Sequence, residues 1–125
     1  MQMNIKMKGE VNRKDLDRYF RTITLGIYKD VIIGTPVDTG RARGNWQLAI
    51  GSAPVNEAQR KEKGEGGSQI RQASSKMNRP LAGRSVFIAN NISYIGELEE
   101  GSSKQSKGFV QNALNRAETR IIALD

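Results

Sequence analysis

The sequence predicts one small α+β domain that spans residues 1–125. Apolar residues recur at helical spacing near both ends of the chain, and two short segments between them alternate apolar with polar residues. These elements occur in mixed order, as in an α+β fold. We therefore expect a long N-terminal helix, a small antiparallel β-sheet and a C-terminal amphipathic helix, built around one hydrophobic core.

The first predicted element is a long amphipathic helix over residues 12–33. Asn12 can cap its N-terminus, with Asp15 three positions later as in a capping box. The helix should end before Pro36, because proline disfavours helical geometry at the preceding residue and has no amide donor. Its apolar stripe consists of Leu16, Tyr19, Phe20, Ile23, Ile27 and Val31.

Two segments, residues 45–50 and 84–89, predict the strands of the sheet. Each is short and alternates, which is typical of a half-buried strand. The apolar positions on one face are Trp46, Leu48 and Ile50 in the first strand, and Val86 and Ile88 in the second.

The residues between these strands predict a loop and a short helix. Residues 53–67 are polar and rich in glycine, and we expect them to form a flexible, exposed loop. Ser68 can then cap a helix that runs to about Met77 and stops before Pro80.

After the second strand, the sequence predicts a turn and two further helices. Asn90 and Asn91 favour the turn. One or two helical turns follow from Tyr94 to Gly101, which can close them in a left-handed conformation. Ser106 starts the final helix, whose apolar face is Val110, Ala113, Leu114, Ala117, Ile121 and Leu124.

The composition excludes most catalytic chemistry. The chain contains no cysteine and no histidine, so it lacks thiolates, the commonest general base and the commonest metal ligand. We expect no catalytic residue, no metal site, no cofactor and no enzymatic activity. The chain also lacks a signal-peptide core and a long apolar run, so we expect synthesis in the cytoplasm and no membrane contact.

The net charge is +7 and the pI is near 10.0. A basic surface attracts phosphate backbones without reading their sequence. A small basic nucleic-acid-binding domain is therefore an alternative interpretation, although no stacking aromatics or recognition motif accompany the charge.

Asp38-Thr39-Gly40 also matches the triplet of aspartic proteases, which suggests a dimeric protease as a further alternative. In that family two aspartates share one proton across a dimer axis. Here Arg41 and Arg43 follow the triplet and would hold both aspartates ionised. The long opening helix also disagrees with an almost all-strand fold.

The same residues have a structural interpretation as a turn between helix and strand. Pro36 fixes one dihedral angle, Asp38 and Thr39 can bond back to nearby amides, and Gly40 accepts a positive φ. In this interpretation the residues of the turn have no catalytic role.

The charged and aromatic residues near the turn have two interpretations each. Arg41 and Arg43 are either solvated or paired with Glu99 and Glu100, on the same subunit or on a neighbouring one. The two large aromatics, Trp46 and Tyr94, are either core residues or interface anchors. As an anchor, Trp46 together with Arg43 would place the outer face of its strand at an interface.

Three segments resemble, in order and spacing, elements of the tail-completion (neck) protein family of long-tailed bacteriophages. The first is Pro36-Val37-Asp38-Thr39-Gly40 followed by Arg43 and Trp46, similar to "PVDTG…R..W". The second, residues 86–95, is similar to "VYITNN.PY". The third, residues 98–105, is similar to "LE.G.S.Q". The candidate turn and interface residues are Pro36, Asp38, Thr39, Gly40, Arg41, Arg43, Trp46, Asn90, Asn91, Tyr94, Glu99, Glu100 and Gly101.

The resemblance implies a structural virion protein rather than an enzyme. Members of the family act in tail completion and head–tail joining, after synthesis in the host cytoplasm. The implied assembly is a ring of identical subunits around the DNA channel, a hexamer like the tail itself. Implied partners are other copies of the chain, tail terminator, tail tube or head-connector proteins, and channel DNA through non-specific contact.

Overall fold

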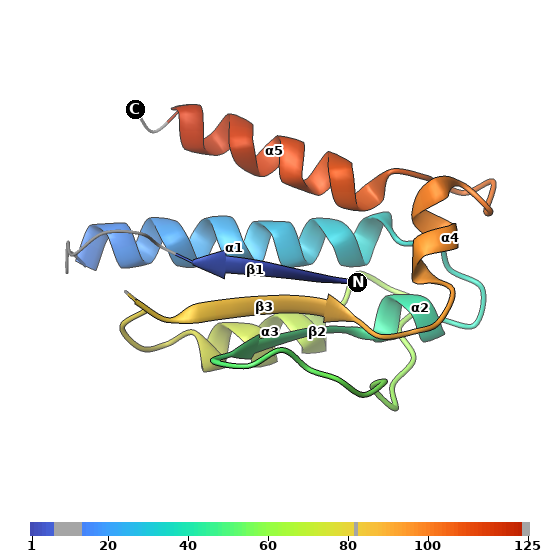
Figure 1. Ribbon diagram of the computed structural model, residues 1–125, viewed down its shortest axis with the longest axis horizontal. Coiled ribbons are helices and arrows are strands. Elements are labelled where there is room, and N and C mark those ends of the chain that lie inside the picture. Colours follow the sequence, from blue (N-terminus) through green and yellow to red (C-terminus); the bar gives the residue numbers. More distant parts are fainter. Residues whose placement is uncertain (7–13, 82, 124–125) are drawn as a thin grey trace.

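A computed structural model describes residues 1–6, 14–81 and 83–123. Its helices and its three-stranded antiparallel sheet confirm the predicted α+β class (Figure 1). Asn12, the predicted helix cap, and Leu124 lie outside the described residues. The elements in chain order are β1 (Gln2–Lys6), α1 (Lys14–Gly34), α2 (Arg41–Gly44), β2 (Trp46–Ile50), α3 (Gly67–Lys76), β3 (Ser85–Asn90), α4 (Ile95–Glu100) and α5 (Phe109–Ala123).

The sheet has the order β1-β3-β2, so the strand latest in the sequence lies at its centre. Ile88 of β3 is flanked by Met3 of β1 and Leu48 of β2, and both pairings are antiparallel. The two predicted strands are confirmed, whereas β1 was not predicted. Its alternation rests on only Met3 and Ile5, which is too short a pattern to separate a strand from coil.

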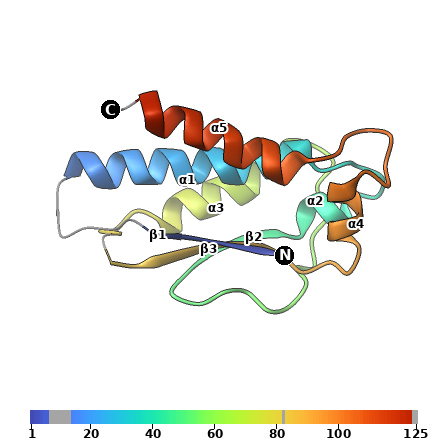
Figure 2. The ribbon, with the colours of Figure 1, turned by 45° about the horizontal axis from the view of Figure 1, so that its top comes forward.

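Helix α1 lies between the sheet and α5, and α3 packs beside it (Figures 1 and 2). Because α1 has neighbours on two sides, it buries a wider face than the predicted stripe, including Tyr28 and Ile32. Tyr19 was predicted to be in the stripe, but 48% of its surface is exposed. None of the helices in the described part of the chain is both long and apolar enough to cross a membrane.

Two predicted helix starts are wrong. Helix α3 begins at Gly67, after Gly66 with φ 77°, so Ser68 lies inside the helix and does not cap it. Helix α5 begins at Phe109, after Gly108 with φ 65°. In both cases a glycine in the left-handed region redirects the chain, and no serine side chain caps the helix.

Tyr28 is buried in the core, and its hydroxyl donates a hydrogen bond to the Trp46 carbonyl at 2.8 Å. Burial raises the pKa of its phenol above the ordinary 10.0, and the nearby Arg60 charge opposes this rise only in part. Above about pH 10 the unfolded chain loses this proton while the folded chain keeps it, so stability falls as the pH rises.

We expect Tyr28→Phe to remove the part of the loss of stability at high pH that comes from the Tyr28 phenol. At neutral pH the variant should lose about 0.5–1.5 kcal/mol, the value of one hydrogen bond. The measurement is the urea midpoint at about pH 9 and about pH 11. The exposed Tyr19 supplies the control, because Tyr19→Phe should keep the wild-type decline. An equal decline in Tyr28→Phe and wild type would contradict the expectation.

Candidate interaction site

The three segments that carry the family resemblance meet at one end of the molecule, where α2 and α4 lie close together (Figures 1 and 2). They enclose a pocket of about 370 Å³, which we name the turn pocket. Its lining residues are Pro36, Val37, Asp38, Thr39, Gly40, Arg41, Ala42, Tyr94, Leu98, Ser103 and Gln105. The turn after α1, helix α4 and the loop before α5 therefore build one site.

Gln105 joins the third segment to the first. Its side-chain amide donates to the Val37 carbonyl at 2.7 Å, and its side-chain oxygen accepts the Val37 amide at 2.8 Å. The side chain thus pairs with the backbone as a neighbouring strand would. Ser106 adds a second link, because its hydroxyl donates to the Gly34 carbonyl at the end of α1.

The turn itself has the predicted glycine conformation but not all of the predicted hydrogen bonds. Gly40 has φ 88°, and the Thr39 hydroxyl accepts the Arg41 amide at 3.2 Å. Asp38 is exposed, and among the described residues no hydrogen bond to its carboxylate is found. The predicted backbone bond of Asp38 is therefore wrong, because Thr39 and Gly40 suffice to form the turn.

Arg43 is neither solvated nor paired with Glu99 or Glu100. Its guanidinium donates to the carbonyls of Ile33 at 2.7 Å, of Thr35 at 3.0 and 3.1 Å, and of Gly64 at 2.6 Å. Ile33 and Thr35 lie at the C-terminal end of α1, where free carbonyls favour a cation. Partial burial lowers the pKa of Arg43, against the raising effect of Glu62 and Glu65.

Arg41 pairs with Glu57 at 2.7 Å, and this contact raises the pKa of its guanidinium. Glu99 belongs to α4, but its side chain reaches the start of α5, where its carboxylate accepts hydrogen bonds from the amides of Val110 at 3.0 Å and Gln111 at 3.1 Å. The contact predicted between the two arginines and Glu99 or Glu100 is therefore not formed within the subunit. Backbone groups occupy two of these four side chains, Arg43 and Glu99, and Glu57 occupies a third, Arg41.

We expect Glu99→Ala to destabilise the fold by about 0.5–2 kcal/mol, the usual effect of removing a helix cap. Two amides at the positive end of α5 would lose their acceptor. The measurement is thermal or urea unfolding followed by circular dichroism. The exposed Glu100 is the matched control, since Glu100→Ala should stay within about 0.5 kcal/mol of wild type. Equal effects of the two substitutions would contradict this role of Glu99.

Trp46 is a core residue, which bears out the first of its two interpretations and not the second, an interface anchor. Its side chain is 0% exposed, and its indole nitrogen donates to the Thr35 hydroxyl at 2.8 Å. That hydroxyl in turn donates to the Val31 carbonyl. Tyr94, in contrast, is half-buried at the N-terminus of α4 and lines the turn pocket.

The asparagine pair and Gly101 have structural roles. The buried Asn90 side chain donates to the Ala42 carbonyl at 2.8 Å, which ties β3 to α2. Asn91 donates to the carbonyls of Pro54 and Asn56, both at 3.0 Å. Gly101 ends α4 with φ 108°, as predicted.

Residues 51–66 form a loop without helix or strand, close to the predicted 53–67, but this loop is attached to the fold and is only partly exposed. The Arg60 side chain donates to the carbonyls of Gly44 at 2.7 Å and Trp46 at 2.6 Å. The Glu62 amide donates to the Gly40 carbonyl at 2.9 Å. The loop therefore packs along α2. Its polar composition did not predict this packing.

Three residues that hold the site and its neighbouring loop together were not among the predicted site residues: Thr35, Arg60 and Gln105. Gln105 lies within a segment that resembles the family, and that segment was the only available signal for it. Thr35 and Arg60 act through backbone groups that only the tertiary fold brings near. In the part of the chain that the structure describes, no three acidic side chains gather as a metal site would require.

Fold and site together define a small α+β domain with a pocket built from turns, short helices and backbone hydrogen bonds. No protein-family model, curated protein or solved structure matches this chain.

Proposed function

We propose that this chain is a structural virion protein of a tailed bacteriophage that acts in tail completion and head–tail joining. It would form a ring around the DNA channel, a hexamer, and would contact tail terminator, tail tube or head-connector proteins. In this proposal it is located in the virion neck and has no enzymatic activity.

One observation carries the proposal: the first segment with family resemblance (residues 36–46) builds one pocket with the two neighbouring segments at 86–95 and 98–105, which lie far from it in the sequence. Several residues of these segments contact one another or one shared element, as Gln105 does with Val37 and Asn90 with Ala42. Chance resemblances in two distant parts of the chain would have no reason to converge. A docking surface for a neighbouring virion protein is a function that fits such a pocket.

The charge of the chain is consistent with a location beside DNA. A net charge of +7 on a small subunit would be multiplied around a ring, and positive charge on the channel wall would attract the phosphate backbone without sequence preference.

The protease alternative has less support. Asp38 lies on an exposed turn between a long helix and a one-turn helix, in an α+β fold. The aspartic protease interpretation requires an almost all-strand fold and a shielded pair of carboxylates.

Deletion of the gene from the phage or prophage that encodes it tests the proposal. We expect heads filled with DNA and tails to accumulate unjoined, with few complete particles in electron micrographs. Supplying the wild-type chain in trans should restore infectious particles. A normal yield of complete particles would overturn the proposal. If the isolated chain then also bound DNA with an affinity that falls steeply with salt, the nucleic-acid-binding alternative would be favoured.

A further inference from the structure

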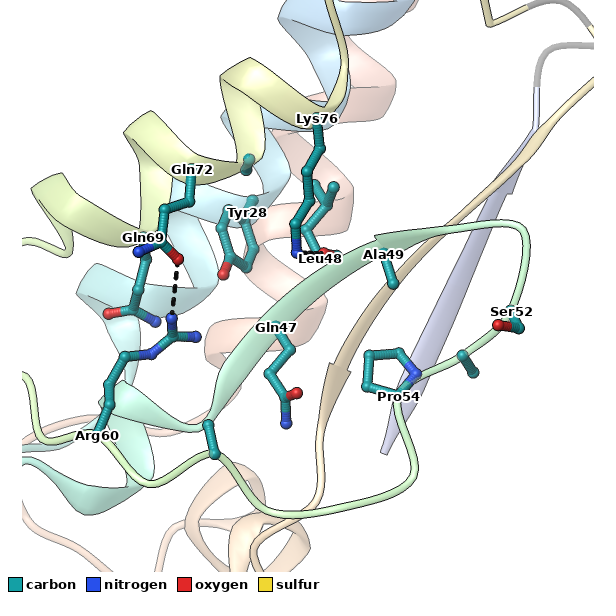
Figure 3. A pocket seen from close by; sticks show the side chains of 13 residues that line it. Tyr28, Gln47, Leu48, Ala49, Ser52, Pro54, Arg60, Gln69, Gln72 and Lys76 are labelled. Carbon is teal, nitrogen blue, oxygen red and sulfur yellow. Dashed lines mark hydrogen bonds between the residues drawn. The ribbon is translucent and has the colours of Figure 1, made fainter.

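A second pocket lies on a different part of the molecule, between α3, β2 and the loop 51–60 (Figure 3). We name it the β2-edge pocket, and its volume is about 370 Å³. Gln69, Gln72 and Lys76 enter it from α3, and Arg60 enters from the loop. The lining is polar and basic, and none of the described residues that line it is acidic.

The outer edge of β2 forms one wall of this pocket. The Gly51 amide bonds to Ser85 of β3 at 2.9 Å, so the backbone groups of residues 47, 49 and 51 face β3. By alternation, the backbone groups of Trp46, Leu48 and Ile50 face away from β3.

The Trp46 and Leu48 carbonyls on this edge already have donors. The Trp46 carbonyl accepts bonds from Tyr28 at 2.8 Å, Arg60 at 2.6 Å and Gln69 at 3.0 Å. The Leu48 carbonyl accepts the Lys76 ammonium at 3.1 Å. Among the described residues, the buried side-chain oxygen of Gln69 has no donor, but the pocket contains two cations and no acidic lining residue, which favours an acidic group as its occupant.

The two cations of the pocket have only neutral partners. Arg60 donates to the backbone carbonyls of Gly44 and Trp46 and to the side-chain oxygen of Gln72 at 3.5 Å, and Lys76 donates to Leu48. Among the described residues, neither forms an ion pair with a carboxylate. Both charges are thus available to a carboxylate that comes from outside the subunit.

Helix α4 of another copy offers a surface that is complementary in charge. Glu97 and Glu100 are both exposed, and their spacing of three residues places them on one side of the helix. Glu100 lies at the C-terminal end of α4, where the helix dipole disfavours a negative charge, and the last turn contains no basic residue. In the described part of the chain neither carboxylate has an ion-pair partner.

We propose that the β2-edge pocket of one subunit receives Glu97 and Glu100 of a second copy. The pocket and α4 are different surfaces, so the contact is head-to-tail and can close a ring. The inference rests on the proposed function in one respect, namely that the assembly is a ring of this chain. A recessed pocket suits a carboxylate side chain better than it suits the phosphates of duplex DNA, which need a continuous basic surface.

Cysteine pairs test this contact cleanly, because the chain has no cysteine of its own. Ser52 lines the pocket and is exposed, and Gly96 is on α4 with open space around a built Cβ. Both substitutions leave all four charged residues in place. Under mild oxidation, the Ser52→Cys/Gly96→Cys chain should form a ladder of cross-linked oligomers that ends in a closed ring. The mismatched pair Thr22→Cys/Gly96→Cys should form none above background.

The charges provide a second readout of the same experiment. Added to the matched cysteine pair, Lys76→Glu should slow cross-linking at least about tenfold, and a further Glu100→Lys should restore it. Lys76→Gln, which removes the charge without reversing it, should fall between wild type and Lys76→Glu. Melting curves of each variant establish that it is folded.

Three results would overturn the proposal: no cross-linking in the matched pair, equal cross-linking in the mismatched pair, or indifference to Lys76→Glu in a folded variant. These outcomes are independent of the deletion experiment on the encoding phage. Unjoined heads and tails after deletion, together with no cross-linking, would reject this contact and leave the proposed function standing. Cross-linked rings together with normal particles after deletion would reject the function and leave the contact.

Discussion

Replacing Trp46 with alanine is expected to cost about 3–5 kcal/mol of stability, the largest effect of any substitution considered for this chain. The side chain is fully buried, and its indole bonds to Thr35 at the end of α1. Removing it would leave a large cavity between α1 and the sheet. Since small domains have about 5–15 kcal/mol of total stability, this loss is a large fraction of the total, and the variant should melt well below wild type.

Two further variants isolate the cause of this loss. Trp46→Phe keeps most of the buried volume but loses the hydrogen bond to Thr35, so it should cost clearly less. Leu114→Ala truncates a side chain that is 37% exposed, and it should cost less still. Unfolding should be followed by circular dichroism, because Trp46 is the only tryptophan. A Trp46→Ala variant that melts near wild type would contradict the central place of this residue in the core.

Gly40→Val is expected to have the next largest effect, and to prevent assembly of complete particles. Gly40 has φ 88°, so a β-branched residue there costs about 1–3 kcal/mol in backbone strain. A Cβ atom would also lie 2.8 Å from the Glu62 carbonyl oxygen. The side chain would thus push away the loop that bonds to the turn.

Gly51→Val separates the two causes, because Gly51 has φ 98° but open space around a built Cβ. It should show the strain without the clash, and so lose less stability than Gly40→Val. Melting temperatures and complementation of the gene deletion measure both effects. Equal losses at the two positions would show that Glu62 does not matter.

Asp38→Asn tests the alternative chemistry of the same turn. The Asp38 carboxylate is exposed, so the substitution should change stability by less than about 0.5 kcal/mol and leave particle yield nearly normal. The protease interpretation predicts the opposite ranking, with Asp38→Asn inactive and well folded. If Asp38→Asn eliminates infectious particles while melting like wild type, Asp38 has a chemical or interface role.

The elements with a long or regular apolar pattern could be predicted from the sequence. Helix α1, strands β2 and β3 and the glycine at the end of α4 were all predicted close to their observed positions. Strand β1 could not be, because its partner is distant in the sequence and its own pattern contains two apolar residues. The starts of α3 and α5 were misplaced, since serine is only a local signal. At α3, Gly66 lies so close to Ile32 that a Cβ would approach it to 2.7 Å.

The sequence predicted where the candidate site lies, but it did not predict most of the contacts within it. The turn, Tyr94 and the segment of Gln105 were all identified, and the fold brings them together around one pocket. The partners of Arg43 and Glu99 could not be anticipated from charge. Both bind backbone groups at helix ends, and only the tertiary fold determines which helix ends lie within reach.

The central position of β3 also determines when the chain can fold during translation. Strands β1 and β2 each pair with β3 and not with each other, so neither has a partner on the ribosome until Asn90 has been synthesised. The face of α1 that packs against α5 stays uncovered for longer still, until α5 has been synthesised. We therefore expect nascent chains to stay largely unfolded until they are nearly complete, and to need protection of their apolar segments until release.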